Sequence, residues 1–234
     1  MPRPAPASLP TPRLVDGPAG ADATVLLAHG AGGGMETPFL ATIATGLAGR
    51  GWRVVRFAFP FMARRQQGGR RGVPDRLPKL LEVFREQVGL ERGAAPLVLA
   101  GKSLGGRVAT LLLEELAGDA PPAEDRGVCG GLCFGYPFHP PGRPETLRTA
   151  HLEQLPLPTL IVQGSRDPFG RRAEVEGYAL APAIQLAWIA GGDHSLKPAR
   201  GAGLSPAEAL AVAVEAADAF LRQILLTPGM HRTP

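Results

Sequence analysis

Three polar residues of the chain, Ser103, Asp167 and His194, each follow closely on an apolar run. A serine hydroxyl is a weak nucleophile until a base within hydrogen-bond distance accepts its proton. A histidine can accept that proton and return it to a leaving group, while a carboxylate holds the imidazole in the required tautomer. These residue types therefore predict nucleophilic catalysis, provided that the fold brings the three side chains together.

The residues around Ser103 have the pattern of a sharp turn between a strand and a helix. An apolar run at 97–100 leads into Gly101-Lys102-Ser103-Leu104-Gly105, and apolar residues then recur at helical spacing. The two glycines remove Cβ atoms that would clash in so tight a turn. This G-x-S-x-G pattern predicts a serine at the N-terminus of a helix, where negative charge is stabilised.

A phosphate-binding P-loop is the alternative interpretation of Gly101-Lys102-Ser103. That loop requires a glycine five residues before Gly101, but Pro96 is at that position. The residues between them form an apolar strand and not a glycine-rich loop. The P-loop is therefore excluded. The serine motif also arises by chance in a chain with 31 glycines, so its partners elsewhere in the sequence decide the interpretation.

Asp167 is the better of two candidate acids. It follows its own apolar run and can face His194 across the edge of a sheet, although an Asx turn before Pro168 would also explain it. Asp193 adjoins the histidine, and because neighbouring side chains usually diverge we expect it to be a loop residue.

The tetrahedral intermediate of acyl transfer carries an oxyanion that needs two preorganised N–H donors. The N–H of Leu104 is one candidate. The N–H of Ala31, in the small-residue loop that follows His29, is the better candidate for the second, with Gly32 close behind. A flexible turn is the alternative for this loop, and we interpret His29 as a structural residue that orders it.

Apolar side chains on loops near the serine predict a shallow pocket for a small acyl group. The candidate substrate contacts are Gly32, Met35, Phe61 and Phe138, although each apolar member could equally belong to the core. Lys102 adjoins the nucleophile and either points away, meets an anionic group or forms an ion pair with a nearby helix.

The formal net charge of +4 is modest, and its densest cluster is Arg64, Arg65, Arg70 and Arg71. No aromatic residues are interleaved with these arginines, so we expect a solvated loop and no nucleic-acid partner. Contact with an anionic substrate or a nucleic acid is the second interpretation of the cluster.

Cysteine usage and hydropathy bear on the compartment. Cys129 and Cys133 are four residues apart on one apolar stretch and, as strand residues, would face the same side about 13 Å apart, too far for a disulfide. We expect buried free thiols in a reducing compartment. The N-terminus lacks a secretory apolar region and no run of 18 apolar residues exists. A cytoplasmic protein without a membrane span, a metal or a cofactor is therefore predicted.

Alternating strands and helices define the expected architecture. The expected apolar strands are at 24–28, 52–58, 97–100, 127–134, 159–163 and 185–190. They alternate with expected helices at about 37–48, 74–90, 104–118, 172–180 and 205–225. Continuously apolar strands alternating with helices predict a mostly parallel sheet with helices on both faces. Functional groups of such sheets gather at the carboxyl ends of the strands, where the serine, the acid, the histidine and the glycine loop all fall.

We expect a single domain at 24–226 between an extended N-terminal tail at 1–23 and a C-terminal tail at 227–234. A short edge strand near 13–15 is expected within the first tail. The connection at 135–157 is too short for a large lid domain.

The order glycine loop, serine, acid, histidine is the chain order of an α/β-hydrolase triad. With the motifs HGAG at 29–32, GKSLGGR at 101–107, QGSRDPFG at 163–170 and GDHS at 192–195, the chain resembles a small α/β-hydrolase-fold family that includes bacterial predicted hydrolases and testis-expressed protein 30. It is similar more distantly to dienelactone hydrolases, whose nucleophile is cysteine where this chain has Ser103. The resemblance covers residues 23–225 and implies a lidless serine hydrolase that cleaves a small-molecule carboxylic ester or thioester through an acyl-enzyme. It implies no oligomeric state.

Two other functions are compatible with the same fold. The chain could be a non-catalytic binding protein that uses the pocket or the arginine loop, as some relatives in chromatin complexes have no proven catalysis. It could also be an acyltransferase or a C–C hydrolase with the same triad. Labelling of the serine by a fluorophosphonate distinguishes a hydrolase from the non-catalytic binding protein. Analysis of the products distinguishes a hydrolase of esters or thioesters from an acyltransferase or a C–C hydrolase.

Overall fold

A computed structural model describes residues 11–66, 68, 73–93, 95–117 and 127–226 of the chain. Its strands are β1 (Arg13–Asp16), β2 (Thr24–Ala28), β3 (Arg53–Phe57), β4 (Leu97–Lys102), β5 (Val128–Phe134), β6 (Thr159–Gly164) and β7 (Ile184–Ile189). They form one sheet in the order β1-β3-β2-β4-β5-β6-β7. Strand β1 pairs antiparallel with β3, and the other neighbours are parallel.

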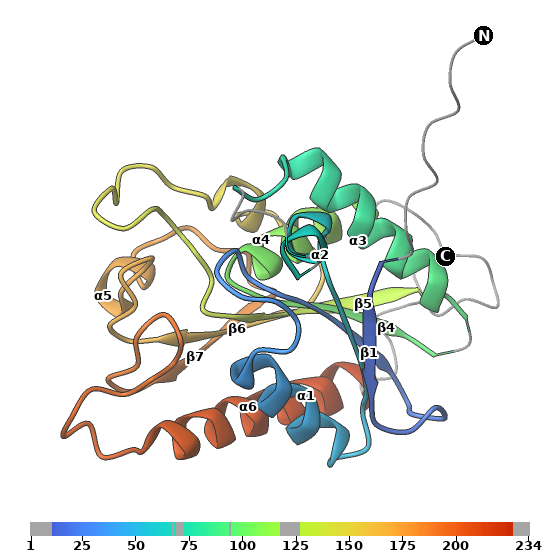
Figure 1. Ribbon diagram of the computed structural model, residues 1–234. Coiled ribbons are helices and arrows are strands. Elements are labelled where there is room, and N and C mark those ends of the chain that lie inside the picture. The colour runs from blue at the N-terminus through green and yellow to red at the C-terminus, as the bar shows by residue number, and fades with distance from the viewer. Residues whose placement is uncertain (1–10, 67, 69–72, 94, 118–126, 227–234) are drawn as a thin grey trace, which may run out of the picture.

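Helices cover both faces of this sheet. They are α1 (Pro38–Ala48), α2 (Pro60–Gln66), α3 (Leu77–Glu91), α4 (Leu104–Leu116), α5 (Arg172–Val175) and α6 (Pro206–Leu226), with a short 3-10 helix η1 at Ala150–Leu152. Helices α1 and α6 lie against one face, and α3 and α4 lie against the other (Figure 1). The predicted α/β-hydrolase architecture, a mostly parallel sheet between two helical layers, is confirmed.

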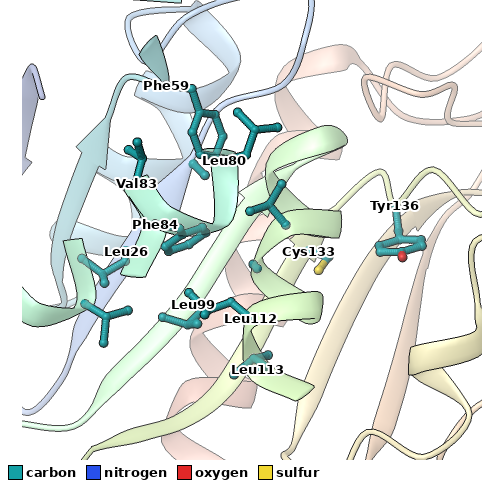
Figure 2. Packing of buried hydrophobic residues seen from close by; sticks show 14 of the residues in the cluster. Leu26, Phe59, Leu80, Val83, Phe84, Leu99, Leu112, Leu113, Cys133 and Tyr136 are labelled. Carbon is teal, nitrogen blue, oxygen red and sulfur yellow. The ribbon is translucent and has the colours of Figure 1, made fainter. Parts of the chain in front are cut away.

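Each face of the sheet buries its own hydrophobic core. On one face Leu26 and Leu99 pack with Phe84 and Leu112 in a cluster that we call the α3–α4 core (Figure 2). Leu27, the next residue along β2, belongs to the α1–α6 core on the opposite face. Because both faces are covered, the strands are apolar at successive positions rather than at alternate ones. Burial of each such leucine contributes about 2 kcal/mol.

The two cysteines lie on opposite faces, contrary to the expectation that they share one. Cys133 packs in the α3–α4 core (Figure 2) and Cys129 in the α1–α6 core. The cause is a register shift in β5, whose pairing with β4 passes from Val128 directly to Gly130. Cys129 is the extra residue of a β-bulge, and an extra residue inverts the alternation beyond it. Both thiols are buried and free, as predicted.

The structure also places the edge strand expected near residue 13 and part of the arginine cluster. The edge strand expected near residue 13 exists as β1, so the sheet includes residues that we assigned to the N-terminal tail. Arg64 and Arg65 lie in the last turn of α2 rather than in a loop. Arg70, Arg71 and the tail at 227–234 lie outside the described residues. Within the described ranges, no helix has both the length and the hydropathy that a membrane crossing requires.

Candidate active site

Ser103 lies in a strained turn between β4 and α4. Its φ of 52° and ψ of −114° are values that side-chain-bearing residues rarely adopt, and such strain costs about 1–3 kcal/mol. Close packing holds the turn in place. A Cβ on Gly101 would lie 2.2 Å from the backbone carbon of Gly105, and one on Gly105 would lie 2.5 Å from the carbonyl oxygen of Ala28. The expected strand–turn–helix arrangement is present, with the serine at the helix N-terminus.

A chain of hydrogen bonds joins the serine, the histidine and the acid. Nε2 of His194 lies 2.8 Å from Oγ of Ser103, and its Nδ1 lies 2.8 Å from Oδ2 of Asp167. Because a carboxylate only accepts hydrogen bonds, Nδ1 carries the proton and Nε2 is free to accept that of the hydroxyl. The structure thus brings together three side chains from the ends of β4 and β6 and from the loop after β7.

Asp167 is fully buried and held from two sides. The side-chain amide of Gln163 donates to Oδ2 at 2.9 Å, and the N–H of Phe169 donates to Oδ1 at 2.9 Å. The second bond is the Asx turn that was the alternative explanation of this residue, so the carboxylate makes both contacts at once. Asp193 accepts the backbone N–H groups of Ser195 and Lys197, which is the expected role of a loop residue.

His29 orders the glycine loop, as expected. Its Nε2 accepts the N–H of Phe59 at 2.9 Å, so Nδ1 carries the proton and donates to the carbonyl oxygen of Gly30 at 2.7 Å. Burial lowers the pKa of His29, which keeps the ring neutral. The far end of the loop is held by Arg56, which donates to the carbonyl oxygen of Met35 at 2.8 Å.

A cavity of about 460 Å³ opens at the hydroxyl of Ser103. The glycine loop, the start of α1 and the loops after β6 and β7 form its walls. Its lining residues are Gly30, Ala31, Gly32, Gly33, Thr37, Pro38, Phe39, Leu40, Lys102, Ser103, Phe169, His194 and Ser195. Ala31 and Gly32 therefore face the same space as the serine. Leu104 is the first residue of α4, where backbone N–H groups have no acceptor within the helix.

Three predicted substrate contacts lie elsewhere, which corrects the pocket prediction. Met35, Phe61 and Phe138 are 4%, 6% and 0% exposed, and the cavity lining does not include them. Phe61 falls in the first turn of α2, and its ring packs edge-on against His29 with the ring centroids 5.4 Å apart. Phe138 packs against Tyr136 at 4.8 Å. All three side chains contribute to the protein interior.

Two aromatic residues that we did not predict as substrate contacts line the cavity instead. Phe169 lies over the imidazole of His194, with ring centroids 4.1 Å apart, and shields one face of the ring. Phe39 is the second residue of α1. The sequence contained one indication that each residue lies near the site. Phe169 is two residues from Asp167, and Phe39 is in the first turn of the helix after the glycine loop. Among the residues that the structure describes, no three histidine, cysteine or acidic side chains are grouped so as to hold a metal ion.

The sheet, the turn at Ser103 and the acid and base on the following loops define an α/β-hydrolase-like class of protein. A family model described as alpha/beta hydrolase domain matches residues 21–222. The chain therefore belongs to the α/β-hydrolase domain family.

Solved structures of other proteins share the fold over most of their length. Est1E from Butyrivibrio proteoclasticus, solved with ferulic acid bound, is similar with a TM-score of 0.66 and 16% identity over 93% of this chain and 96% of that one. Dienelactone hydrolase from Anabaena variabilis ATCC 29413 gives 0.66 and 20% over 91% of each chain. An α/β serine hydrolase without a lid from Xanthomonas campestris gives 0.61 and 20% over 95% of this chain and 90% of that one.

Proposed function

We propose that this protein is a serine hydrolase that cleaves a small carboxylic ester or thioester through an acyl-enzyme. The supporting observation is the continuous hydrogen-bond chain from Ser103 through His194 to Asp167, whose nucleophilic end opens into a cavity. Membership of the α/β-hydrolase family supports hydrolysis as the reaction class.

The proposed reaction proceeds in two halves with the same groups. Oγ of Ser103 attacks the acyl carbon while its proton moves to Nε2 of His194, and the N–H groups of Ala31 and Leu104 stabilise the oxyanion. When the bond to the leaving oxygen or sulfur breaks, Nε2 returns the proton to it. Water then attacks the acyl-enzyme, gives a proton to Nε2, and the acid leaves as Ser103 regains its hydrogen. Asp167 keeps the imidazole in one tautomer throughout.

The cavity favours a compact acyl group with an apolar face. Its volume of about 460 Å³ is in the lower half of the range for small-molecule sites. Phe39 and Phe169 offer two aromatic walls, and a short aliphatic or aromatic acyl group would bury its surface against them. From the sequence features alone, we also propose that the chain is similar to testis-expressed protein 30 and that the protein is cytoplasmic.

Active-site labelling tests the proposal. A fluorophosphonate probe should attach to the peptide that contains Ser103, and Ser103→Ala should abolish both labelling and hydrolysis of a series of p-nitrophenyl esters of increasing acyl length, a loss of roughly 10⁴-fold or more. Ser205→Ala, which removes a cap at the start of α6 far along the chain, is the matched control and should label normally.

Two outcomes would contradict the proposal. If the wild-type protein neither labels nor hydrolyses any ester or thioester in the series, a non-catalytic binding protein becomes the better explanation. If it labels but passes the acyl group to an added alcohol in preference to water, the protein is an acyltransferase.

A further inference from the structure

Lys102 is a partly buried cation that the proposed reaction does not use. It is the last residue of β4, directly before Ser103, and it is one of the residues that line the cavity. Its Nζ donates a hydrogen bond to the backbone carbonyl oxygen of His194 and lies 5.4 Å from the centre of the Phe39 ring. The residue next to the proposed nucleophile is thus tied to the backbone of the proposed base.

The residue that follows β5 makes room for this contact. Gly135 has a φ of +63°, and a Cβ there would lie 2.8 Å from Nζ of Lys102 and 2.6 Å from the carbonyl oxygen of His194. Any other residue would therefore collide with both partners. The backbone N–H of Gly135 donates to Val162 at 2.8 Å, which fixes this segment against β6.

The surroundings of the ammonium group explain why it is tolerated. The charges of Asp167 and Asp193 lie close enough to favour the protonated form, and the ring of Phe39 lies within cation–π distance of it. The third neighbour is His194 itself, whose backbone carbonyl oxygen accepts the hydrogen bond from Lys102. A partly buried ammonium group that is retained among these partners needs a reason beyond packing, since an apolar side chain would fill the space at lower cost.

We propose that Lys102 is a positioning residue of this site, whose protonated amine holds the backbone of His194 so that Nε2 stays aligned with Ser103. The proposal rests on the proposed hydrolase function, because it assigns Lys102 a role through the base rather than contact with the reacting atoms.

Protonation of Lys102 gives the inference a signature in the pH profile. Burial lowers the pKa of Lys102 to about 8, against the opposing effect of Asp167 and Asp193. A charge-assisted hydrogen bond is stronger than a neutral one, so the hold on His194 weakens once the proton leaves. We therefore expect kcat to decline as the pH rises through about 8.

Lys102→Met tests the role with a side chain of similar length that has neither charge nor donor. We expect kcat at pH 7 to fall roughly tenfold or more with little change in KM, and the decline near pH 8 to disappear. Lys79→Met is the matched control, because Lys79 is exposed on α3 and pairs with Glu82. It should keep the wild-type rate and pH profile.

Chemical rescue keeps the test valid if the methionine variant folds poorly. Lys102→Cys, alkylated with 2-bromoethylamine, regains an amine of lysine length and should regain kcat and an alkaline decline. Cys129 and Cys133 are buried, and burial raises the pKa of both thiols, so they should react with the reagent far more slowly than the thiol of Lys102→Cys, which lines the cavity.

The results separate this inference from the proposed function. If the wild type labels and turns over, but Lys102→Met retains both the rate and the alkaline decline, the role of Lys102 is refuted and the hydrolase stands. A lower rate with an unchanged pH profile that the amine does not rescue also refutes it. If the wild type is inactive towards every probe and substrate, both are wrong.

Discussion

Two buried glutamines of the chain have opposite hydrogen-bond environments. The amide of Gln163 donates to Asp167 and to the Tyr136 carbonyl oxygen, and accepts the Tyr136 N–H. Gln87 on α3 is 1% exposed, yet neither of its amide atoms has a partner in the part of the chain that the structure describes. A buried polar group stabilises a fold only when its hydrogen bonds are made. The same substitution should therefore act in opposite directions at these two positions.

We expect Gln163→Met to lower the free energy of unfolding by about 2 kcal/mol, because it leaves the Tyr136 N–H without its acceptor. Turnover should fall roughly tenfold as Asp167 loses a donor that orients it. Gln87→Met should raise the free energy of unfolding by about 1 kcal/mol and leave turnover unchanged. Urea denaturation and kcat, measured on the same preparations, check both. Equal losses at the two positions would contradict the argument.

The polar residues of the site could be predicted from the sequence, whereas its apolar lining could not. Few residue types can act as nucleophile, base and orienting acid, and Ser103, His194 and Asp167 each follow a strand that ends at the same edge of the sheet. Phenylalanines carry no such constraint. Phe39 faces the cavity and Phe61 faces the core because of how α1 and α2 are oriented, which is decided by packing between distant segments.

At the scale of elements, the close approach of α4 to the end of β2 sets the position of Ser103. Gly105 lies where a Cβ would be 2.5 Å from the Ala28 carbonyl oxygen and 2.7 Å from that of His29. Both contacts are with backbone, which cannot rotate away as a side chain would. The helix can therefore start beside β2 only with glycine at this position.

Gly105→Ala should lower the free energy of unfolding by about 3 kcal/mol and abolish labelling of Ser103, because α4 must move away from β2. Gly89→Ala in α3 is the matched control. A Cβ there meets nothing within 4 Å, and alanine should stabilise the helix by about 0.5–1 kcal/mol. Thermal unfolding of both variants checks the prediction, which would be wrong if the two melting temperatures shifted in the same direction.

The strands and the longer helices followed from apolar periodicity and from the glycine and proline punctuation, whereas the short helices α2 and η1 and the bulge in β5 did not. The bulge at Cys129 changes which face the following residues of β5 occupy. It depends on the register between β5 and β4, which are separated along the chain by α4. Alternation along a single strand does not reveal its register with the neighbouring strand. The prediction that Cys129 and Cys133 face the same side was therefore wrong.

At the scale of the whole molecule, two buried neutral histidines link stability to pH. Burial lowers the pKa of His29, and burial with the charge of Arg107 lowers the pKa of His151 to about 4. Oγ1 of Thr110 on α4 and Nε2 of His151 in η1 share a hydrogen bond of 2.9 Å, with the Tyr136 hydroxyl 3.4 Å from the same nitrogen. His151 therefore joins α4 to the segment after β5, and it is burial and the charge of Arg107 that favour its uncharged ring.

Linkage gives the direction of the effect. Above the unfolded pKa of about 6.5, both states hold a neutral ring and His151 adds no pH dependence. As the pH falls from 6.5 towards 4, the unfolded chain binds a proton that the folded protein excludes, so the free energy of unfolding decreases. Partial access of solvent to the ring limits the loss to about 1 kcal/mol between pH 7 and pH 5.

His151→Gln should flatten this part of the stability profile, because glutamine can keep the hydrogen bond to Thr110 but does not titrate. We expect the variant to be less stable than the wild type at pH 7 by about 1 kcal/mol and to lose less stability on acidification to pH 5. Urea denaturation at half-unit pH steps measures both slopes, and the range from pH 7 to 8 is the internal reference in which the two curves should run parallel. Parallel curves down to pH 5 would mean that His151 carries the same charge in the folded and unfolded states.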